Sequence, residues 1–240
     1  LYSVLLEIQI FSHLRYYRTH PNIVEILGYD WQKDSSDALY PVVVVEYTPL
    51  GTLLDYLEEH GRELKSELKG KLCFDIAKGL HFVQNSGIAH GDVKLQNILV
   101  FPGEDTHPVA KISDFGHSRT CLDMKEPQRY SGTRLYVPLE AWDGQLLTLE
   151  QLFQCDIFAF GLAIWEILQD GKVYNSEDHS KVFNGSQQSW CITIGGLCKD
   201  FLLRAFEAEP TSCPFPNFYN DIFENTFLQE PQLRYTIAEL

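Results

Sequence analysis

The chain has 240 residues, of which 45% are hydrophobic and 13% aromatic, which is sufficient for a buried core in one large domain or two small lobes. Its formal net charge of −14 argues against a nucleic-acid partner, because the phosphates would be repelled. No apolar run approaches the roughly 20 residues that a membrane-spanning helix needs, so we predict no membrane span. The six cysteines show no Cys-x-x-Cys pair, which indicates a reduced cytoplasmic or nuclear setting and neither a zinc site nor a disulfide framework.

The N-terminal part of the chain predicts a helix followed by two strands. Apolar residues recur at near-helical spacing over about the first 16 residues, at Leu5, Ile8, Phe11 and Leu14. Pro21 ends this helix, since the residue before a proline avoids the helical region. Residues 23–31 and 39–47 are expected to be strands, with the polar stretch 32–37 as the turn between them. The β-branched run 42–45 predicts a strand buried on both faces.

The remainder of the chain predicts mostly helix. Residues 48–51 form a linker, after which Thr52 can cap a short helix over 53–59. Apolar residues from Leu68 to Val83 mark a long helix that ends near residue 87, and the segment 152–168 is apolar almost all round, which is typical of a buried helix. Further helices are expected around 201–203 and 219–227. A few strands followed mainly by helices indicate a two-lobed α+β protein.

Residues 90–97, which read HGDVKLQN, place three chemically different side chains just before the apolar run 98–100. In phosphoryl transfer, a carboxylate accepts the proton of the attacking hydroxyl, a lysine neutralises charge on the phosphoryl group, and an amide oxygen holds a metal ion. Asp92, Lys94 and Asn97 would supply these groups. A solvated polar turn is the alternative, but the fixed offsets of these residue types make a chance match rare.

A second carboxylate, in Asp114-Phe115-Gly116, follows the next apolar run at 109–112. Magnesium prefers oxygen ligands and takes only one or two from the protein when nucleotide phosphates supply the rest. We therefore predict that Asn97 and Asp114 together hold Mg²⁺.

On these motifs the chain resembles the eukaryotic protein kinase catalytic domain of the serine/threonine type, over about residues 1–240 and beginning at the helix called C. The resemblance implies a protein-kinase-like two-lobed α+β fold, with a partial N-lobe at 1–47, a hinge at 48–51 and a mostly helical C-lobe at 52–240. It also implies ATP and Mg²⁺ as cofactors and a protein substrate with a serine or threonine acceptor. The glycine-rich loop and the strand lysine of the family's N-lobe are not in this sequence.

The resemblance assigns further site residues. Backbone groups of Glu46 and Thr48 would bind adenine, with Val45 as the gatekeeper and Leu99 as the floor of the adenine pocket. Glu7 stands where the helix C glutamate is expected, although a solvated helical glutamate explains it equally well. Thr133 joins Asp92, Lys94 and Asn97 as a catalytic residue, and with Lys94 it gives the serine/threonine pattern. The resemblance also implies a structural pair between Glu140 and Arg234. Asp156 would accept hydrogen bonds from amides of the catalytic loop, residues 90–97.

The sequence departs from the family pattern in two places, at Gly91 and in the missing strand lysine, and two other functions therefore stay open. Gly91 replaces the arginine that normally pairs with a phosphorylated activation loop, so phosphorylation there, for example at Thr120, should matter less. The same His-Gly-Asp spelling occurs in small-molecule kinases that modify antibiotics or choline. Those lack the segments around Thr133, Asp156 and Arg234. The third alternative is a pseudokinase or interaction module, because the phosphate-gripping lysine is not in the sequence.

Overall fold

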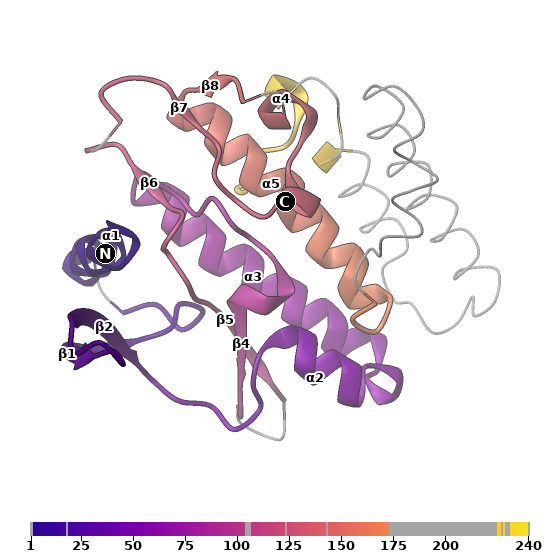
Figure 1. Ribbon diagram of the computed structural model, residues 1–240. Coiled ribbons are helices and arrows are strands. Elements are labelled where there is room, and N and C mark those ends of the chain that lie inside the picture. The colour runs from indigo at the N-terminus through magenta and orange to yellow at the C-terminus, as the bar shows by residue number, and fades with distance from the viewer. Residues whose placement is uncertain are drawn as a thin grey trace.

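The computed structural model describes residues 2–17, 19–103, 107–122, 124–142, 144–172, 225–226, 228 and 231–239. Helix α1 (Tyr2–Tyr17) and a two-stranded hairpin lie at one end of the described part (Figure 1). Three helices form the body beside them: α2 (Leu53–His60), α3 (Ser66–Asn85) and α5 (Leu149–Leu168). The helices and strands predicted from the sequence up to residue 168 are therefore present, each within a few residues of its predicted bounds.

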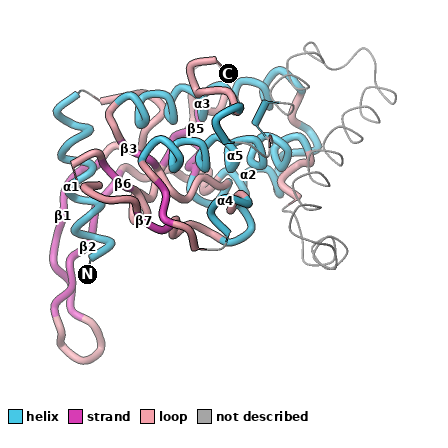
Figure 2. The backbone as a smooth tube through the Cα atoms, turned by 90° about the horizontal axis from the view of Figure 1, so that it is seen from above, coloured by secondary structure: helices cyan, strands magenta, loops and turns pink. Residues whose placement is uncertain are grey.

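The hairpin consists of the antiparallel strands β1 (Ile26–Lys33) and β2 (Leu39–Val45), with a register irregularity between Ile26 and Gly28. It projects from the body in Figure 2. Its Val43 packs against the core, but Val44 is 43% exposed. The prediction that the valine run is buried on both faces is therefore wrong. Among the described residues, the core packs against the face of the hairpin that carries Val43, and the face that carries Val44 is left to solvent.

Helices α2 and α5 both begin at a threonine. Thr52 accepts a hydrogen bond from the backbone of Asp55, whose carboxylate bonds back to the Thr52 backbone, and Thr148 and Gln151 form the same reciprocal pair. Such capping boxes satisfy backbone N–H groups that a helix start otherwise leaves unpaired. The cap at Thr52 confirms the predicted start of the short helix.

Short strands connect the helices. Strand β3 (Ile88–Ala89) pairs with β6 (Arg119–Thr120), β4 (Ile98–Phe101) with β5 (Val109–Ile112), and β7 (Gln128–Arg129) with β8 (Leu146–Leu147). In the β4–β5 ladder Ile98 lies opposite Ile112. The residue before β4 and the residue after β5 therefore meet, since the Ser113 N–H donates to the Asn97 carbonyl over 2.9 Å. This contact joins the two motifs that the sequence singled out.

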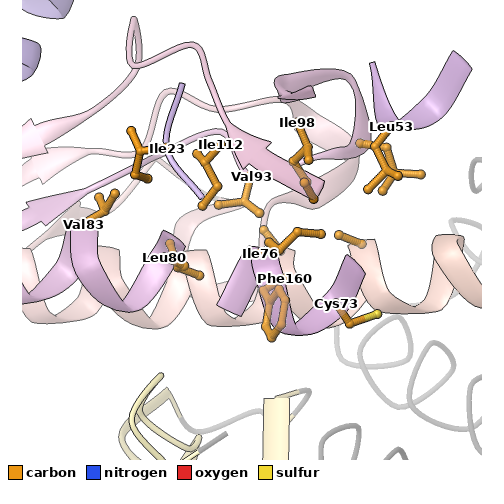
Figure 3. Close-up of a cluster of buried hydrophobic side chains, with 14 of the residues drawn as sticks. Ile23, Leu53, Cys73, Ile76, Leu80, Val83, Val93, Ile98, Ile112 and Phe160 are labelled. Atoms are coloured by element: carbon orange, nitrogen blue, oxygen red, sulfur yellow. The ribbon is translucent and has the colours of Figure 1, made fainter. Parts of the chain in front are cut away.

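The core lies between α3, α5 and the β4–β5 ladder. Figure 3 shows Ile76, Leu80 and Val83 of α3 beneath Ile98 and Ile112. Helix α5 is long and apolar enough to cross a membrane by composition, but most of it is buried inside the fold, as in the core helix of a globular domain. The remaining elements are α4 (Leu139–Trp142) and the 3₁₀ turns Gly61–Glu63, Leu95–Asn97, Arg134–Tyr136 and Pro231–Leu233.

Two predicted helices fall largely outside the described residues. The segment around 201–203 is not described, and of 219–227 only Asn225 and Thr226 are, in helical conformation.

Candidate active site

The loop 90–97 is held in place by hydrogen bonds to Asp156, a buried residue of α5. The Asp156 oxygens accept the backbone N–H groups of His90 and Gly91, at 2.7 and 2.9 Å, which confirms the contact predicted for this aspartate. Gly91 has φ +79°, and a Cβ there would lie 2.6 Å from the carbonyl oxygen of His117. The backbone at this position thus requires glycine, and no side chain extends from it toward His117.

His90 is a neutral structural residue in this loop. Its Nε2 lies 3.0 Å from the Ser113 carbonyl, which can only accept, and its Nδ1 lies 3.2 Å from the Asp92 N–H, which can only donate. These partners fix the tautomer with the proton on Nε2. Burial lowers the pKa of His90, which agrees with the neutral form. The His90 ring therefore fixes the position of the Asp92 backbone.

The Asp92 carboxylate is the centre of a hydrogen-bond network. Lys94 Nζ donates to Asp92 Oδ2 over 2.6 Å and to the Thr133 hydroxyl over 2.7 Å. The Thr133 N–H donates to Asp92 Oδ1 over 2.7 Å, and Asn97 Nδ2 donates to Oδ2 over 2.9 Å. The structure therefore brings all four residues predicted to be catalytic into direct contact.

These donors determine the charge of Asp92. Burial alone would raise the pKa of its carboxyl group, but the bonds from Lys94 and Thr133 outweigh burial, and the pKa is lowered from its ordinary value. The group is therefore a carboxylate at neutral pH. A fixed carboxylate beside a lysine can orient a hydroxyl and accept its proton while the lysine offsets negative charge.

Two oxygen groups are suitable for a magnesium ion. Asn97 turns its Nδ2 to Asp92, so its Oδ1 has no hydrogen bond to any residue that the structure describes. Asp114 follows the Ser113 contact with Asn97, is exposed, and has φ +60°. Within the described ranges no three His, Cys, Asp or Glu side chains cluster to hold a metal. Asn97 and Asp114 would offer two oxygen ligands, which is as many as Mg²⁺ takes from a protein when a bound nucleotide supplies the others.

Glu7 lies near this site. Burial raises the pKa of its carboxyl group, the neighbouring Asp114 carboxylate raises it further, and a hydrogen bond from the Phe115 backbone opposes both. Phe11, one turn after Glu7, packs edge-to-face against Phe115 at a centroid distance of 5.1 Å. Glu7 is therefore half-buried beside the Asp-Phe-Gly motif, which disfavours the alternative of a solvated helical glutamate.

The segment from Glu46 to Thr48, which is predicted to bind adenine, has backbone groups without a hydrogen bond among the described residues. Neither the Glu46 carbonyl nor the Thr48 N–H has a hydrogen bond to the part of the chain that is described. Adenine needs one free acceptor and one free donor, and these two groups are available for that purpose. The Thr48 hydroxyl instead donates to the Val100 carbonyl, which ties the hinge to β4. Val45 and Leu99 are both half-buried near this segment, at the end of β2 and on β4.

One contact at the hinge was not predicted. Lys111 donates to both carboxylate oxygens of Glu46, at 2.6 and 2.8 Å, and its Nζ lies 4.3 Å from the centroid of the Phe101 ring. Glu46 Oε1 also accepts the Glu25 N–H over 2.8 Å. The side chain of Glu46 thus links Glu25, the residue before β1, to Lys111 of β5. Nothing in the local sequence signals a pair between residues so far apart in the chain.

The segment around Gly132, which resembles the end of a kinase activation segment, packs tightly on the loop 90–97. A Cβ on Gly132 would lie 2.2 Å from the Gly91 carbonyl oxygen, so only glycine fits between these backbones. Beyond it, the Tyr136 hydroxyl donates to the buried Glu166 carboxylate over 2.9 and 3.0 Å, a contact that the sequence did not reveal. Arg234 forms a two-pronged pair with Glu140, with one N–O distance of 3.1 Å, which confirms the predicted pair.

Asp156 provides a test by pH. Burial raises the pKa of its carboxyl group from 3.8 to about 7. A raised folded-state pKa contributes stability that is complete below the unfolded value and is lost as pH rises through the folded one. We expect the stability of wild type relative to Asp156→Asn, measured by urea unfolding, to fall between pH 4 and 7.5. A difference independent of pH would contradict the shift.

Comparison with known proteins agrees with this geometry. The sequence profile described as protein tyrosine and serine/threonine kinase matches residues 3–193. The chain therefore belongs to the protein kinase family.

Curated relatives include both acceptor types. The chain is 32% identical over 168 residues to the mouse cytoplasmic tyrosine-protein kinase BMX, which covers 68% of this chain and 24% of that protein. It is 30% identical over 162 residues to the probable serine/threonine-protein kinase gdt8 of Dictyostelium discoideum, covering 68% of this chain and 11% of that protein. The tyrosine-protein kinase receptor svh-2 of Caenorhabditis elegans is 27% identical over 226 residues, 92% of this chain and 18% of that protein. The chain thus spans a quarter or less of the length of these relatives.

Proposed function

We propose that the chain is the catalytic region of a serine/threonine protein kinase, which transfers the γ-phosphoryl group of Mg-ATP to a protein hydroxyl. The observation that carries this proposal is the bridge that Lys94 Nζ makes between the Asp92 carboxylate and the Thr133 hydroxyl. A lysine in the catalytic loop, paired with a threonine of the activation segment, is the serine/threonine pattern of the family that the chain resembles. Tyrosine kinases carry a different set of residues there.

Each side chain has a separate role in this proposal. Asp92 orients the acceptor hydroxyl and takes its proton, while Lys94 offsets the charge on the transferred group. Asn97 and Asp114 would hold Mg²⁺, which when bound supplies charge neutralisation for the phosphates. The free Glu46 carbonyl and Thr48 N–H would receive the adenine edge between Val45 and Leu99. Positioning and electrostatics account for most of the catalysis.

The other two functions receive less support. A small-molecule kinase would not need the packed activation segment, where Gly132 meets Gly91 and Glu140 pairs with Arg234. A pseudokinase or interaction module would not need an ionised Asp92 with Lys94 held in contact with it. Both arrangements fit transfer to a polypeptide acceptor.

The acceptor can be tested directly. With the full-length protein and radiolabelled ATP, we expect label on serine- and threonine-containing peptides and none on matched peptides carrying tyrosine. Aminoglycoside and choline serve as further acceptors. Label only on tyrosine would overturn the serine/threonine assignment, label only on the small molecules would favour that kinase class, and no nucleotide binding would favour the interaction module.

Asp114→Asn is expected to weaken Mg-ATP binding by about tenfold or more. The substitution replaces a carboxylate that would bind Mg²⁺ with a neutral amide of nearly the same size. Calorimetric titration of Mg-ATP measures the effect. Asp37→Asn is the matched control, since Asp37 is also exposed and also has a positive φ, of 65°, but lies in the hairpin turn. Equal affinities of the two variants would remove Asp114 from the metal site.

A further inference from the structure

A basic hollow lies on α3, outside the candidate active site. It has a volume of about 310 Å³ and lies between the turn that follows α1 and the C-terminal half of α3. Three of its lining side chains are His20, Lys78 and His81, and the others are Phe82, Asn85 and Ser86. None of the six is acidic. A hollow of this kind is unexpected on a chain with a net charge of −14.

Lys78 differs from most other described lysines in having no carboxylate partner. Carboxylates lie within 2.6 Å of five lysines, which are Lys33, Lys69, Lys71, Lys94 and Lys111. In the part of the chain that the structure describes, the contact of Lys78 is with the Phe74 ring, at 4.1 Å from the centroid. Burial lowers the pKa of His20, and the nearby Lys78 and His81 lower it further. The hollow therefore gathers one ammonium group and two histidines, with no carboxylate among its lining residues.

Each of the two histidines keeps one ring N–H available as a donor, because its other ring nitrogen already accepts a hydrogen bond. His20 Nδ1 accepts the Asn22 N–H over 3.2 Å, so the proton of the neutral ring is on Nε2. The His20 ring stacks on Phe82 with a centroid distance of 4.7 Å, which fixes its orientation. His81 Nε2 accepts from the Asn85 amide over 2.8 Å, which leaves the proton on Nδ1. Together with the Lys78 ammonium, the hollow offers donors without a competing carboxylate.

An apolar cavity adjoins the basic hollow. It has a volume of about 330 Å³ and shares His20 and Phe82 with the hollow. Much of its remaining lining is hydrophobic, including Phe11, Leu14 and Ile23. Lys111 and Glu25 also line it, but Glu46 neutralises the charge of Lys111, and Glu25 is exposed to solvent. A ligand with an anionic head and an apolar body would match both hollows at once.

We propose that the basic hollow binds a phosphate monoester, with the phosphoryl group held by His20, Lys78 and His81 and its apolar body in the adjoining cavity. Phosphate presents more acceptor oxygens than a carboxylate and carries up to two negative charges, which suits a hollow lined by three donor side chains. The proposal does not depend on the kinase activity, since none of these residues belongs to the candidate active site.

The experiment is a histidine-selective NMR titration of the full chain with inorganic phosphate and with phenyl phosphate, at constant ionic strength and pH. We expect saturable shifts of the His20 and His81 ring protons and several-fold tighter binding of phenyl phosphate. Lys78→Ala should raise both dissociation constants about tenfold, a loss of about 1.4 kcal/mol. His20→Asn, which keeps an acceptor for the Asn22 N–H, should weaken binding similarly.

Lys65→Ala is the matched control, because Lys65 is exposed at the opposite end of α3. His90 and His117 report separately on binding in the candidate active site. Shifts that do not saturate, or equal effects of Lys78→Ala and Lys65→Ala, would overturn the site. Equal affinity for the two probes would reject the role of the apolar cavity, and with it the monoester, in favour of free phosphate.

Discussion

Replacing Asp92 with asparagine is expected to lower the rate of phosphoryl transfer by about 10²–10⁴-fold, the range typical of a lost general base. Asparagine keeps the size of the side chain and one oxygen for the Thr133 N–H. It cannot accept the proton of an attacking hydroxyl, and its amide group would face Lys94 or Asn97, both of which donate to Asp92 in the wild type. Nucleotide affinity should stay nearly unchanged, because Asp92 is not among the residues expected to hold Mg-ATP.

Asp75→Asn provides the matched control for this experiment. Asp75 is also buried, pairs with Lys71 over 2.6 Å and accepts the backbone N–H of Ala110, but it lies on α3 away from the loop. Both variants lose a buried carboxylate that is bonded to a lysine. We expect stability losses of similar size in unfolding experiments and a loss of turnover only in Asp92→Asn. Wild-type kinetics of Asp92→Asn would remove the proposed proton acceptor.

The part of the site that could be predicted from sequence is the part whose signal is local. Asp92, Lys94 and Asn97 are within one short loop, and a 3₁₀ turn over Leu95–Asn97 brings the amide back to the carboxylate. The start of α2 could be predicted for the same reason, since Thr52 and the backbone that it caps are three residues apart. Where a motif is short and its chemistry needs adjacent groups, residue spacing alone determines the geometry.

Contacts between distant segments could not be predicted in this way. Lys111 and Glu46 are 65 positions apart, and their pairing depends on how the hairpin docks on β5. The exposure of Val44 depends on whether other elements pack on its face of the hairpin, which a β-branched run does not encode. The pair between Glu140 and Arg234, although 94 positions apart, was foreseen because a family resemblance carries information about tertiary contacts.

Breaking this last pair is expected to have the largest effect on stability. The Arg234 side chain is fully buried and that of Glu140 is 12% exposed. Glu140→Gln would leave the guanidinium charge in the interior with a neutral partner, and loss of one member of a buried pair costs roughly 3–5 kcal/mol. Denaturant unfolding monitored by circular dichroism measures this as a decrease in the free energy of unfolding.

The double variant Glu140→Gln/Arg234→Met separates the lost attraction from the cost of the stranded charge. Arg234 also donates to the carbonyls of Leu228 and Gln154 and lies over the Phe158 ring, so its removal has a cost of its own. Because methionine removes the unpaired charge, the double variant should be more stable than the sum of the single losses predicts.

Exposed charge pairs give the comparison that this prediction needs. Lys33 and Asp37 are separated by 2.6 Å, but their side chains are 59% and 78% exposed, so Lys33→Met should cost less than about 1 kcal/mol. If Glu140→Gln were no more destabilising than Lys33→Met, solvent would have to reach the Arg234 guanidinium. In that case the pair between Glu140 and Arg234 would not be the contact that holds these two distant segments together.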